Sequence, residues 1–335
     1  MNVVTHINQY LTRLENNRLF AGIVFASKNG RIIFNKGYGK AIYEHDIDND
    51  TNTVFKIGSI TKSFTAIAIL QLAEQGKISI HEPISPYFPY QTSSEIITIH
   101  HLLTHSSGIF EFINSMPESE LKSWLASDWS QSDILNLFSN KPLAFEPGTQ
   151  FSYCNSGYFL LGMIIEQVTG LTLEAYFKEH IFVPANMQST YMNDPAKIVM
   201  HRAFGYEESQ EGLLQNAPFV NMNNTFATGG ILSTARDMHH LLGALRSNIL
   251  LSEQSRQLML TPHIEASDFQ YGYGLVIQTS PYGQLVGHSG GIHGFCSICL
   301  HYVDEDLTII VLSNIFRPVD EISRSIAKIV LENGY

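Results

Sequence analysis

The run FTAIAILQLA at residues 64–73 places the strongest constraint on how this chain can fold. It predicts a helix over residues 60–75 whose surface is apolar on nearly every side, with Gln71 as the main exception. A helix of that kind is stable only when other elements surround it. The chain of 335 residues is long enough to supply them, as one large domain or two interleaved ones.

Strand patterns at both ends of the chain predict what surrounds that helix. The runs 21–28 and 31–38 flank Asn29-Gly30, a pair that tolerates the positive φ angles of a tight hairpin turn. Strand-like runs near the other end cover residues 271–279, 284–287, 294–302 and 307–313. Terminal helices are predicted over 2–15 and 320–332. We therefore predict an α+β fold in which one antiparallel sheet, built from both termini, is flanked by helices.

The middle of the chain is predicted to be a mostly helical insertion. Further helical patterns cover residues 131–140, 156–169, 173–180 and 235–246. The acidic stretch 111–128 is expected at the surface. We predict a single unit over 1–335, with an α/β sheet region at 1–57 plus 265–335 and a mostly helical region at 58–264.

Charge and hydropathy exclude several classes of protein. With 20 basic and 31 acidic residues the formal net charge is −11, which disfavours nucleic acid and anionic membrane surfaces as partners. The N-terminal segment lacks the apolar core of a signal peptide, and no run has the length and apolarity of a membrane span. We expect a soluble protein, cytoplasmic or exported with its signal peptide removed, whose partner is a small-molecule or peptide substrate.

Cysteines and histidines show no pattern typical of a metal or redox site. Cys296 and Cys299 are three apart on a predicted strand, so their side chains face opposite sides. The histidines at 100–105 and 239–240 lack the H-E-x-x-H spacing of a zinc site. We therefore expect no metal and no cofactor, and interpret the two cysteines as small buried side chains.

Ser59 and Lys62 stand where the buried helix begins. Residues three apart share a helix face, so the Lys62 amine is predicted beside the Ser59 hydroxyl. A serine hydroxyl needs an adjacent base, and burial together with the positive end of the helix dipole favours the neutral, basic form of lysine. Backbone N–H groups at the same helix end could stabilise an oxyanion. The alternative is a helix-capping serine followed by a solvated lysine.

Tyr153 and Asn155 form a second candidate pair just before the helix predicted over 156–169. They alternate across one residue, so both side chains can face the same side of an extended segment. A phenol can relay protons, and an amide side chain can hydrogen-bond a substrate amide. The alternative is a core tyrosine beside a helix-capping asparagine.

The sequence LVGHSGGIHG at residues 285–294 supplies a third candidate, between two late strands. A glycine-rich strand edge lets a substrate backbone approach and pair with it. His288 could bind an anionic group when protonated or polarise the site when neutral, and the Gly291 N–H is a candidate oxyanion donor. The alternative is a hairpin turn with an incidental histidine.

Together, S-x-x-K at Ser59, Y-x-N at Tyr153 and H-S-G at His288 resemble the motifs of the serine penicillin-recognising hydrolases. That superfamily comprises the class C β-lactamases, the DD-peptidases and related esterases. The separations of 94 and 135 residues between the motifs are similar to those of the family. The segments 102–109, 145–170 and 227–238 also resemble it, so the resemblance spans about residues 20–329.

The resemblance implies a β-lactamase/DD-peptidase-like fold and a role for each motif residue. Ser59 would attack a carbonyl and form an acyl-enzyme, Lys62 would accept its proton, and Tyr153 would pass a proton to the leaving group. The substrate would be held by Asn155, His288, Ser289 and Gly290. The N–H groups of Ser59 and Gly291 would form the oxyanion hole.

The histidine at position 288 separates the possible activities. Class C β-lactamases carry a lysine there, whereas H-x-G occurs in some DD-peptidases and D-amino-acid peptidases of the family. We therefore predict a penicillin-binding DD-peptidase-like enzyme, such as a D-alanyl-D-alanine carboxypeptidase, or a D-amino-acid peptidase. The alternatives are an esterase or β-lactamase of the same family and, from another class, a non-catalytic penicillin-binding sensor or scaffold. We expect no G-x-S-x-G nucleophile elbow, which disfavours an ordinary Ser-His-Asp esterase.

Overall fold

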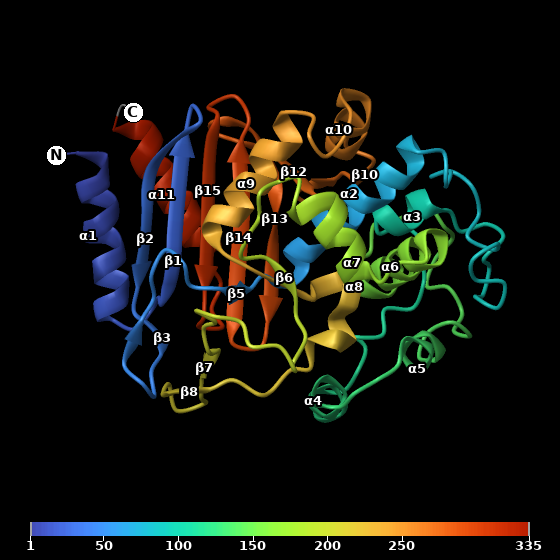
Figure 1. Ribbon diagram of the computed structural model, residues 1–335, viewed down its shortest axis with the longest axis horizontal. Coiled ribbons are helices and arrows are strands. Elements are labelled where there is room, and N and C mark those ends of the chain that lie inside the picture. Colours follow the sequence, from blue (N-terminus) through green and yellow to red (C-terminus); the bar gives the residue numbers. More distant parts are fainter. Residues whose placement is uncertain (1, 334–335) are drawn as a thin grey trace.

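The computed structural model describes residues 2–333 and shows a large antiparallel sheet with helices on both faces (Figure 1). Its strands run in the order β10-β11-β12-β13-β14-β15-β1-β2. Their bounds are β1 Gly22–Lys28, β2 Arg31–Tyr38, β10 Ile264–Glu265, β11 Gln270–Tyr271, β12 Val276–Ser280, β13 Gly283–Ile292, β14 Phe295–Tyr302 and β15 Leu307–Ser313. Both ends of the chain thus contribute to one sheet, as predicted, because β1 pairs with β15.

The hairpin between β1 and β2 confirms the prediction from Asn29-Gly30. The φ angles of these residues are 50° and 71°, which places both in the left-handed region that the turn requires. β1 and its neighbour β15 are buried at every position. Both strands read as continuous apolar runs because helices cover both faces of the sheet here.

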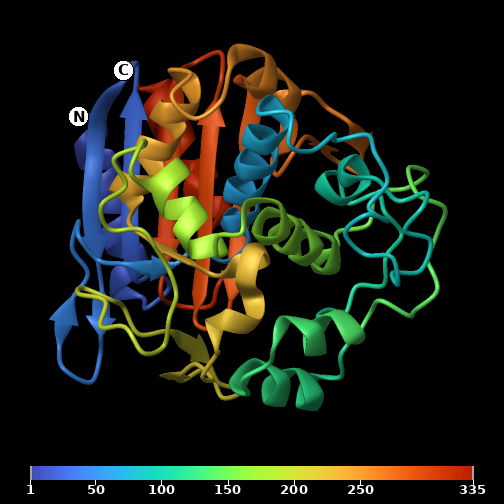
Figure 2. The same ribbon diagram turned by 45° about the vertical axis from the view of Figure 1, so that its right-hand side comes forward.

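The terminal helices α1 (Val3–Asn16) and α11 (Asp320–Glu332) lie together on one face of the sheet (Figures 1 and 2). Helix α1 buries Val3, Ile7 and Leu11, which recur every four residues on a single stripe. Helix α9 (Ala235–Arg246) packs on the opposite face, against β1 and β15. The sheet is therefore the central layer of three.

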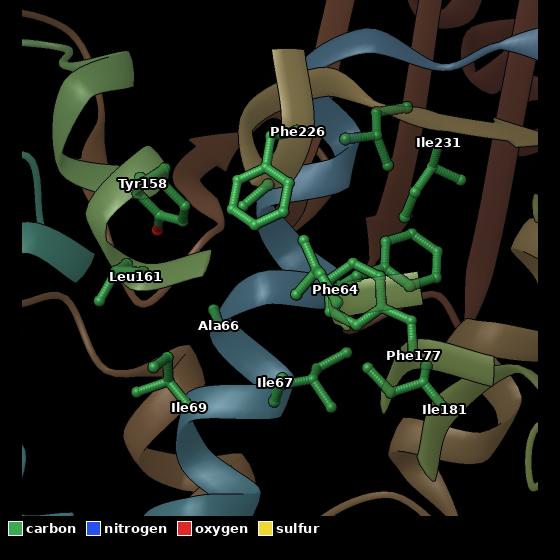
Figure 3. Packing of buried hydrophobic residues seen from close by; sticks show 14 of the residues in the cluster. Phe64, Ala66, Ile67, Ile69, Tyr158, Leu161, Phe177, Ile181, Phe226 and Ile231 are labelled. Atoms are coloured by element: carbon green, nitrogen blue, oxygen red, sulfur yellow. The ribbon is translucent and has the colours of Figure 1, made fainter. Parts of the chain in front are cut away.

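Helix α2 (Thr61–Glu74) is the buried helix that the sequence predicts. Every residue from Thr61 to Leu72 is buried, including the polar ones. It packs against α6 (Asn155–Thr169), α7 (Leu173–Phe177) and α8 (Phe226–Gly229). Figure 3 shows side chains from these neighbours gathered around Phe64, Ala66, Ile67 and Ile69. The apolar surface on all sides of α2 is thus matched by apolar partners on all sides.

The remaining elements are shorter and complete the helical part and its edges. The helices are α3 Ile99–Leu103, α4 Glu118–Ala126, α5 Gln131–Asn136, α10 Glu253–Leu260 and the single turns η1 Gly58–Ile60, η2 Lys178–Phe182 and η3 Met222–Thr225. The short strands are β3 Lys40–Ile42, β4 Ile47–Asp48, β5 Phe55–Lys56, β6 Tyr191–Met192, β7 Tyr206–Glu208, β8 Leu214–Asn216 and β9 Ile231–Ser233.

Two local expectations differ from the structure. Strand β13 continues through the glycine-rich segment to Ile292, because β14 pairs with it from Leu285↔Tyr302 to Ile292↔Phe295. The acidic stretch 111–128 is not simply surface, since Phe112, Trp124 and Leu125 are buried in the core. The net charge of a whole segment gives no sign of such apolar residues. Trp124 and Leu125 belong to α4, and Phe112 lies in the segment before it.

Candidate active site

Ser59 and Lys62 are in contact at the start of α2. Ser59 lies in the single turn η1, which leads directly into α2 at Thr61. The Lys62 Nζ and Ser59 Oγ atoms are 3.2 Å apart. The spacing of three residues therefore places the two side chains on one face, as predicted.

Lys62 is fully buried, and its amine contacts neutral polar groups but no carboxylate. Its side chain is 0% exposed and donates to Asn155 Oδ1 at 2.8 Å and to the Thr228 carbonyl at 3.0 Å. Burial lowers its pKa from the ordinary value of 10.5 to about 7, and the charge of Glu111 opposes that fall. Near neutral pH a large share of Lys62 is therefore the free amine, which can accept a proton.

Tyr153 and Asn155 meet Lys62 from the N-terminal end of α6. The Lys62 Nζ lies 4.8 Å from the centre of the Tyr153 ring. Burial raises the pKa of Tyr153, and the Ser59 hydroxyl opposes that rise. Tyr153 is therefore a neutral phenol at pH 7, able to donate its proton to a neighbouring group and to regain it from another.

Glu111 is a site residue that the sequence did not indicate. Its carboxylate accepts the backbone N–H of Asn155, the backbone N–H of Ser156 at 3.3 Å and the Asn155 side-chain Nδ2–H at 2.9 Å. An anionic acceptor at a helix N-terminus is stabilised by the unpaired N–H groups there. Glu111 thereby fixes the Asn155 amide so that its oxygen points to Lys62.

The strand edge at Gly290 and Gly291 lies against the turn that carries Ser59. A Cβ on Gly290 would stand 2.9 Å from the Ser59 nitrogen, and a Cβ on Gly58 would stand 2.9 Å from the Gly291 nitrogen. Gly58 also has a φ of +52°, which favours glycine. These contacts need glycine, and they place the backbone of Gly290 and Gly291 directly against the turn that carries Ser59.

The same edge of β13 is open toward the cleft. Strand β12 pairs with β13 only between Gly283 and Gly287, so residues 288–292 have no β12 partner on that side. A cleft of about 320 Å³ lies in front of it, and its walls include Ser59, Tyr153, Asn155 and Gly291. An extended substrate could pair with such an edge.

His288 belongs to a buried chain of hydrogen bonds behind Tyr153. The Cys154 N–H donates to His105 Nδ1 at 3.0 Å, so the proton of neutral His105 is on Nε2. His105 Nε2 lies 3.2 Å from the Tyr271 hydroxyl, which lies 3.0 Å from His288 Nε2. The only order that uses each proton once is His105 to Tyr271 to His288, whose Nδ1–H then donates to the Ser289 carbonyl.

These hydrogen bonds hold His288 as a neutral imidazole. Burial, together with the nearby Lys62, lowers the pKa of His288 to about 4. The rings of His288 and Tyr153 lie 6.3 Å apart, so the histidine forms part of the surroundings of the phenol. The sequence left two roles for His288, to bind an anionic group when protonated or to polarise the site when neutral. The geometry favours the neutral role near pH 7. His105 and Tyr271 were not indicated as site residues, and nothing in their spacing could have revealed them.

Ser289 does not line the cleft that holds Ser59, Tyr153 and Asn155. It lines a different cavity, together with Asp320 and Arg324 of α11. Residues 287–291 read Gly-His-Ser-Gly-Gly, so the expectation that the letters G-x-S-x-G are absent is wrong. However, Ser289 sits within β13 and not at a strand-to-helix turn, so the geometry of a nucleophile elbow is missing.

Cys154 and Cys299 are buried thiols, and Cys296 is half-buried. Burial raises the pKa of Cys154 and of Cys299 to about 12. Cys299 packs in the core around α2, whereas Cys296 packs against the core under α1 and α11, so the two face opposite sides of β14. Within residues 2–333 no group of three potential metal ligands is placed to hold an ion. Over the same range no helix has both the length and the apolarity to cross a bilayer.

Comparison with known proteins agrees with this architecture. The sequence profile of the Beta-lactamase family matches residues 7–331. Penicillin-binding protein 4* of Bacillus subtilis is 29% identical over 335 aligned residues, covering 92% of this chain and 71% of that protein. A penicillin-binding protein from Bacillus halodurans has a TM-score of 0.86 at 29% identity, with all of both chains covered. The D-amino acid amidase of Ochrobactrum anthropi SV3, solved with D-phenylalanine, has a TM-score of 0.86 at 23% identity, covering 99% of this chain and all of that one.

The chain therefore belongs to the Beta-lactamase family. The predicted β-lactamase/DD-peptidase-like α+β fold is confirmed, as is the resemblance from which it was inferred. The family and the fold identify the protein as a hydrolase related to the penicillin-binding proteins.

Proposed function

We propose that this protein is a serine hydrolase that forms an acyl-enzyme on Ser59 and acts as a DD-peptidase-like enzyme or D-amino-acid peptidase. The observation that carries the proposal is the contact, at 3.2 Å, between Ser59 Oγ and the amine of the fully buried Lys62. The names of the relatives, penicillin-binding proteins and a D-amino acid amidase, support the substrate class.

The acylation step uses the two residues in contact. Ser59 Oγ attacks the carbonyl carbon of the substrate while its proton passes to Lys62 Nζ, and the carbonyl oxygen becomes an oxyanion. The N–H groups of Ser59 and Gly291 donate to that oxygen, which is where negative charge develops. Lys62 can accept the proton because burial has lowered its pKa to about 7.

The leaving group departs on the side of Tyr153. The tetrahedral intermediate collapses, the bond to the leaving nitrogen or oxygen breaks, and Tyr153 donates its proton to that atom. The proton on Lys62 then passes directly to the Tyr153 oxygen, so that Lys62 is again a free amine and Tyr153 again a neutral phenol. In deacylation a water molecule gives a proton to the same pair and its oxygen attacks the ester carbonyl, which frees Ser59. Because Lys62 and Tyr153 exchange the same proton, they titrate as a pair.

Ester hydrolysis is a second candidate, and the state of His288 favours it. A substrate with a free carboxylate on its leaving group would gain from a positive charge near Tyr153. The neutral His288, whose pKa is lowered to about 4, does not supply that charge near pH 7. Amides and esters with uncharged leaving groups therefore match this part of the site.

The test is a comparison of hydrolysis rates for D-phenylalanine amide, an N-acyl-D-alanyl-D-alanine peptide and p-nitrophenyl acetate. Wild type, Ser59→Ala and Ser289→Ala are measured in parallel. We expect Ser59→Ala to lose all activities, and Ser289→Ala to retain the p-nitrophenyl acetate rate. Equal rates for wild type and Ser59→Ala would favour a non-catalytic binding protein, and loss in Ser289→Ala alone would favour the elbow serine.

A further inference from the structure

A second cavity, of about 470 Å³, adjoins the catalytic cleft and shares His293 with it. Its lining includes two cationic and three aromatic side chains. We call it the basic pocket and define it by Lys56, Arg202, Phe204, Phe219, His293 and Phe295. The proposed mechanism uses none of these residues.

The basic pocket lies on the acyl side of the nucleophile. Lys56 ends β5 and is three residues before Ser59, so the two backbones are at most about 10 Å apart. His288 marks the leaving-group side, because its ring lies 6.3 Å from that of Tyr153. His293 is five residues after His288 and just past the end of β13. Five residues of extended strand span about 16 Å. A substrate that runs along β13 would therefore place its acyl portion toward the basic pocket.

The two cations of the pocket have no acidic partner. Within residues 2–333 neither the Lys56 amine nor the Arg202 guanidinium takes part in a salt bridge or a side-chain hydrogen bond. Burial, and then the charge of Arg202, lowers the pKa of Lys56 to about 8. Burial disfavours each positive charge, and two like charges in one half-buried cavity also repel each other. An anion bound between them would offset both the burial and the repulsion.

The carboxylates near the pocket are already engaged. Glu44 lines it and accepts the hydroxyl proton of Tyr206. His293 Nδ1 lies 3.5 Å from a carboxylate oxygen of Glu207. Glu44 keeps its charge when it accepts this hydrogen bond, but among residues 2–333 neither it nor Glu207 forms an ion pair with Lys56 or Arg202, in a chain whose formal net charge is −11. A local positive site of this kind is not explained by the overall composition.

Aromatic side chains supply the apolar part of the pocket. The Lys56 amine lies 5.4 Å from the centre of the Phe295 ring, which orients it without neutralising it. Phe204 and Phe219 are 49% and 64% exposed, although both line the cavity. Apolar walls with a few converging polar groups are typical of sites for small organic ligands.

We propose that the basic pocket binds a carboxylate carried by the acyl portion of the substrate, with Lys56 and Arg202 as its partners and Phe204 and Phe219 in contact with the intervening carbon chain. The inference rests on the proposed function, because attack by Ser59 defines the acyl side. It narrows the substrate class to acyl donors that end in an acidic group. Arginine and lysine form charge-assisted hydrogen bonds with such a group.

The test uses two esters that differ only in the terminal carboxylate. These are the p-nitrophenyl monoester of pimelic acid and p-nitrophenyl heptanoate, which have acyl chains of equal length. We expect wild type to prefer the pimelate ester in kcat/KM. Lys56→Met and Arg202→Met should each lower kcat/KM for that ester roughly 10- to 100-fold, the loss expected for one charged hydrogen bond. Neither substitution should change the rate with the heptanoate ester.

Lys77→Met is the matched control, because it removes one positive charge from an exposed position outside the pocket. It should leave both rates unchanged. Retained heptanoate hydrolysis shows that each variant is folded, and Arg202→Met carries the test if Lys56→Met does not fold. Equal kcat/KM for the two esters in wild type, or a preference that survives both substitutions, would overturn the inference. If Ser59→Ala hydrolyses both esters as fast as wild type, the proposed function fails instead.

Discussion

The buried Lys62 predicts an unusual dependence of stability on pH, which Lys62→Met should remove. In the unfolded chain a lysine keeps its proton up to a pKa of about 10.5, whereas in the folded protein burial lowers the pKa of Lys62 to about 7. Between these values folding must release one proton. The free energy of unfolding of wild type, relative to the variant, therefore rises with pH, by up to about 1.4 kcal/mol per pH unit.

Between pH 7.5 and 9.5 the two pKa values give a relative gain of about 2–3 kcal/mol for wild type. The assay is urea unfolding of wild type and Lys62→Met at pH 7.5, 8.5 and 9.5. Taking the difference at each pH removes the titrating groups that the two proteins share. The cost of leaving the Asn155 and Thr228 oxygens without a donor in Lys62→Met adds a constant to that difference, so the test is the change of the difference with pH. A difference that stays constant over the range would show that Lys62 keeps its proton in the folded state. The account of Lys62 as a base would then be refuted.

Two further substitutions test the parts of the site around this pair. Tyr271→Phe removes the hydroxyl that donates to His288 Nε2, whereas the Ser289 carbonyl still accepts from Nδ1–H. We expect kcat/KM for p-nitrophenyl acetate to fall about tenfold, and ¹⁵N NMR to show the His288 proton still on Nδ1 with the Nε2 resonance shifted by the loss of its donor. A proton on Nε2, or an unchanged Nε2 resonance, would contradict the assigned direction of these hydrogen bonds. Gly58→Ala places a Cβ 2.9 Å from the Gly291 nitrogen at a φ of +52°, whereas Gly76→Ala has a φ of +67° with nothing within 4 Å. Gly76→Ala should lower the free energy of unfolding by about 1–2 kcal/mol through its backbone conformation alone, and Gly58→Ala by more because of the added overlap with backbone. Only Gly58→Ala should lose esterase activity, and equal activities would argue against the oxyanion hole.

The sequence predicted those features that depend on neighbours along the chain. The contact of Ser59 with Lys62 follows from a spacing of three residues at a helix start. The burial of α2 follows from its apolar surface, and the β1–β2 hairpin from Asn29-Gly30. Each of these follows from geometry that repeats in every helix or turn of its type.

Features that depend on tertiary contacts were not predictable in the same way. Glu111 is 44 residues from Asn155, and Tyr271 is 166 residues from His105. No periodicity joins such residues, and a glutamate in an acidic stretch has the appearance of a surface residue. The positions of Lys56 and Arg202 in one cavity likewise depend on how β5 and a distant loop meet. Similarly, the letters G-x-S-x-G around Ser289 have meaning only once the segment is known to be a strand.

The most direct test of the central claim is labelling with a fluorophosphonate, whose phosphorus atom is attacked by an activated serine with loss of fluoride. Intact-protein mass spectrometry and peptide mapping would follow wild type, Ser59→Ala and Lys62→Met. We predict one phosphonyl group on wild type, mapped to Ser59, none on Ser59→Ala, and strongly slowed labelling of Lys62→Met. Absence of label on wild type, a label on another residue, or equal rates for wild type and Lys62→Met would contradict a nucleophilic Ser59 activated by Lys62.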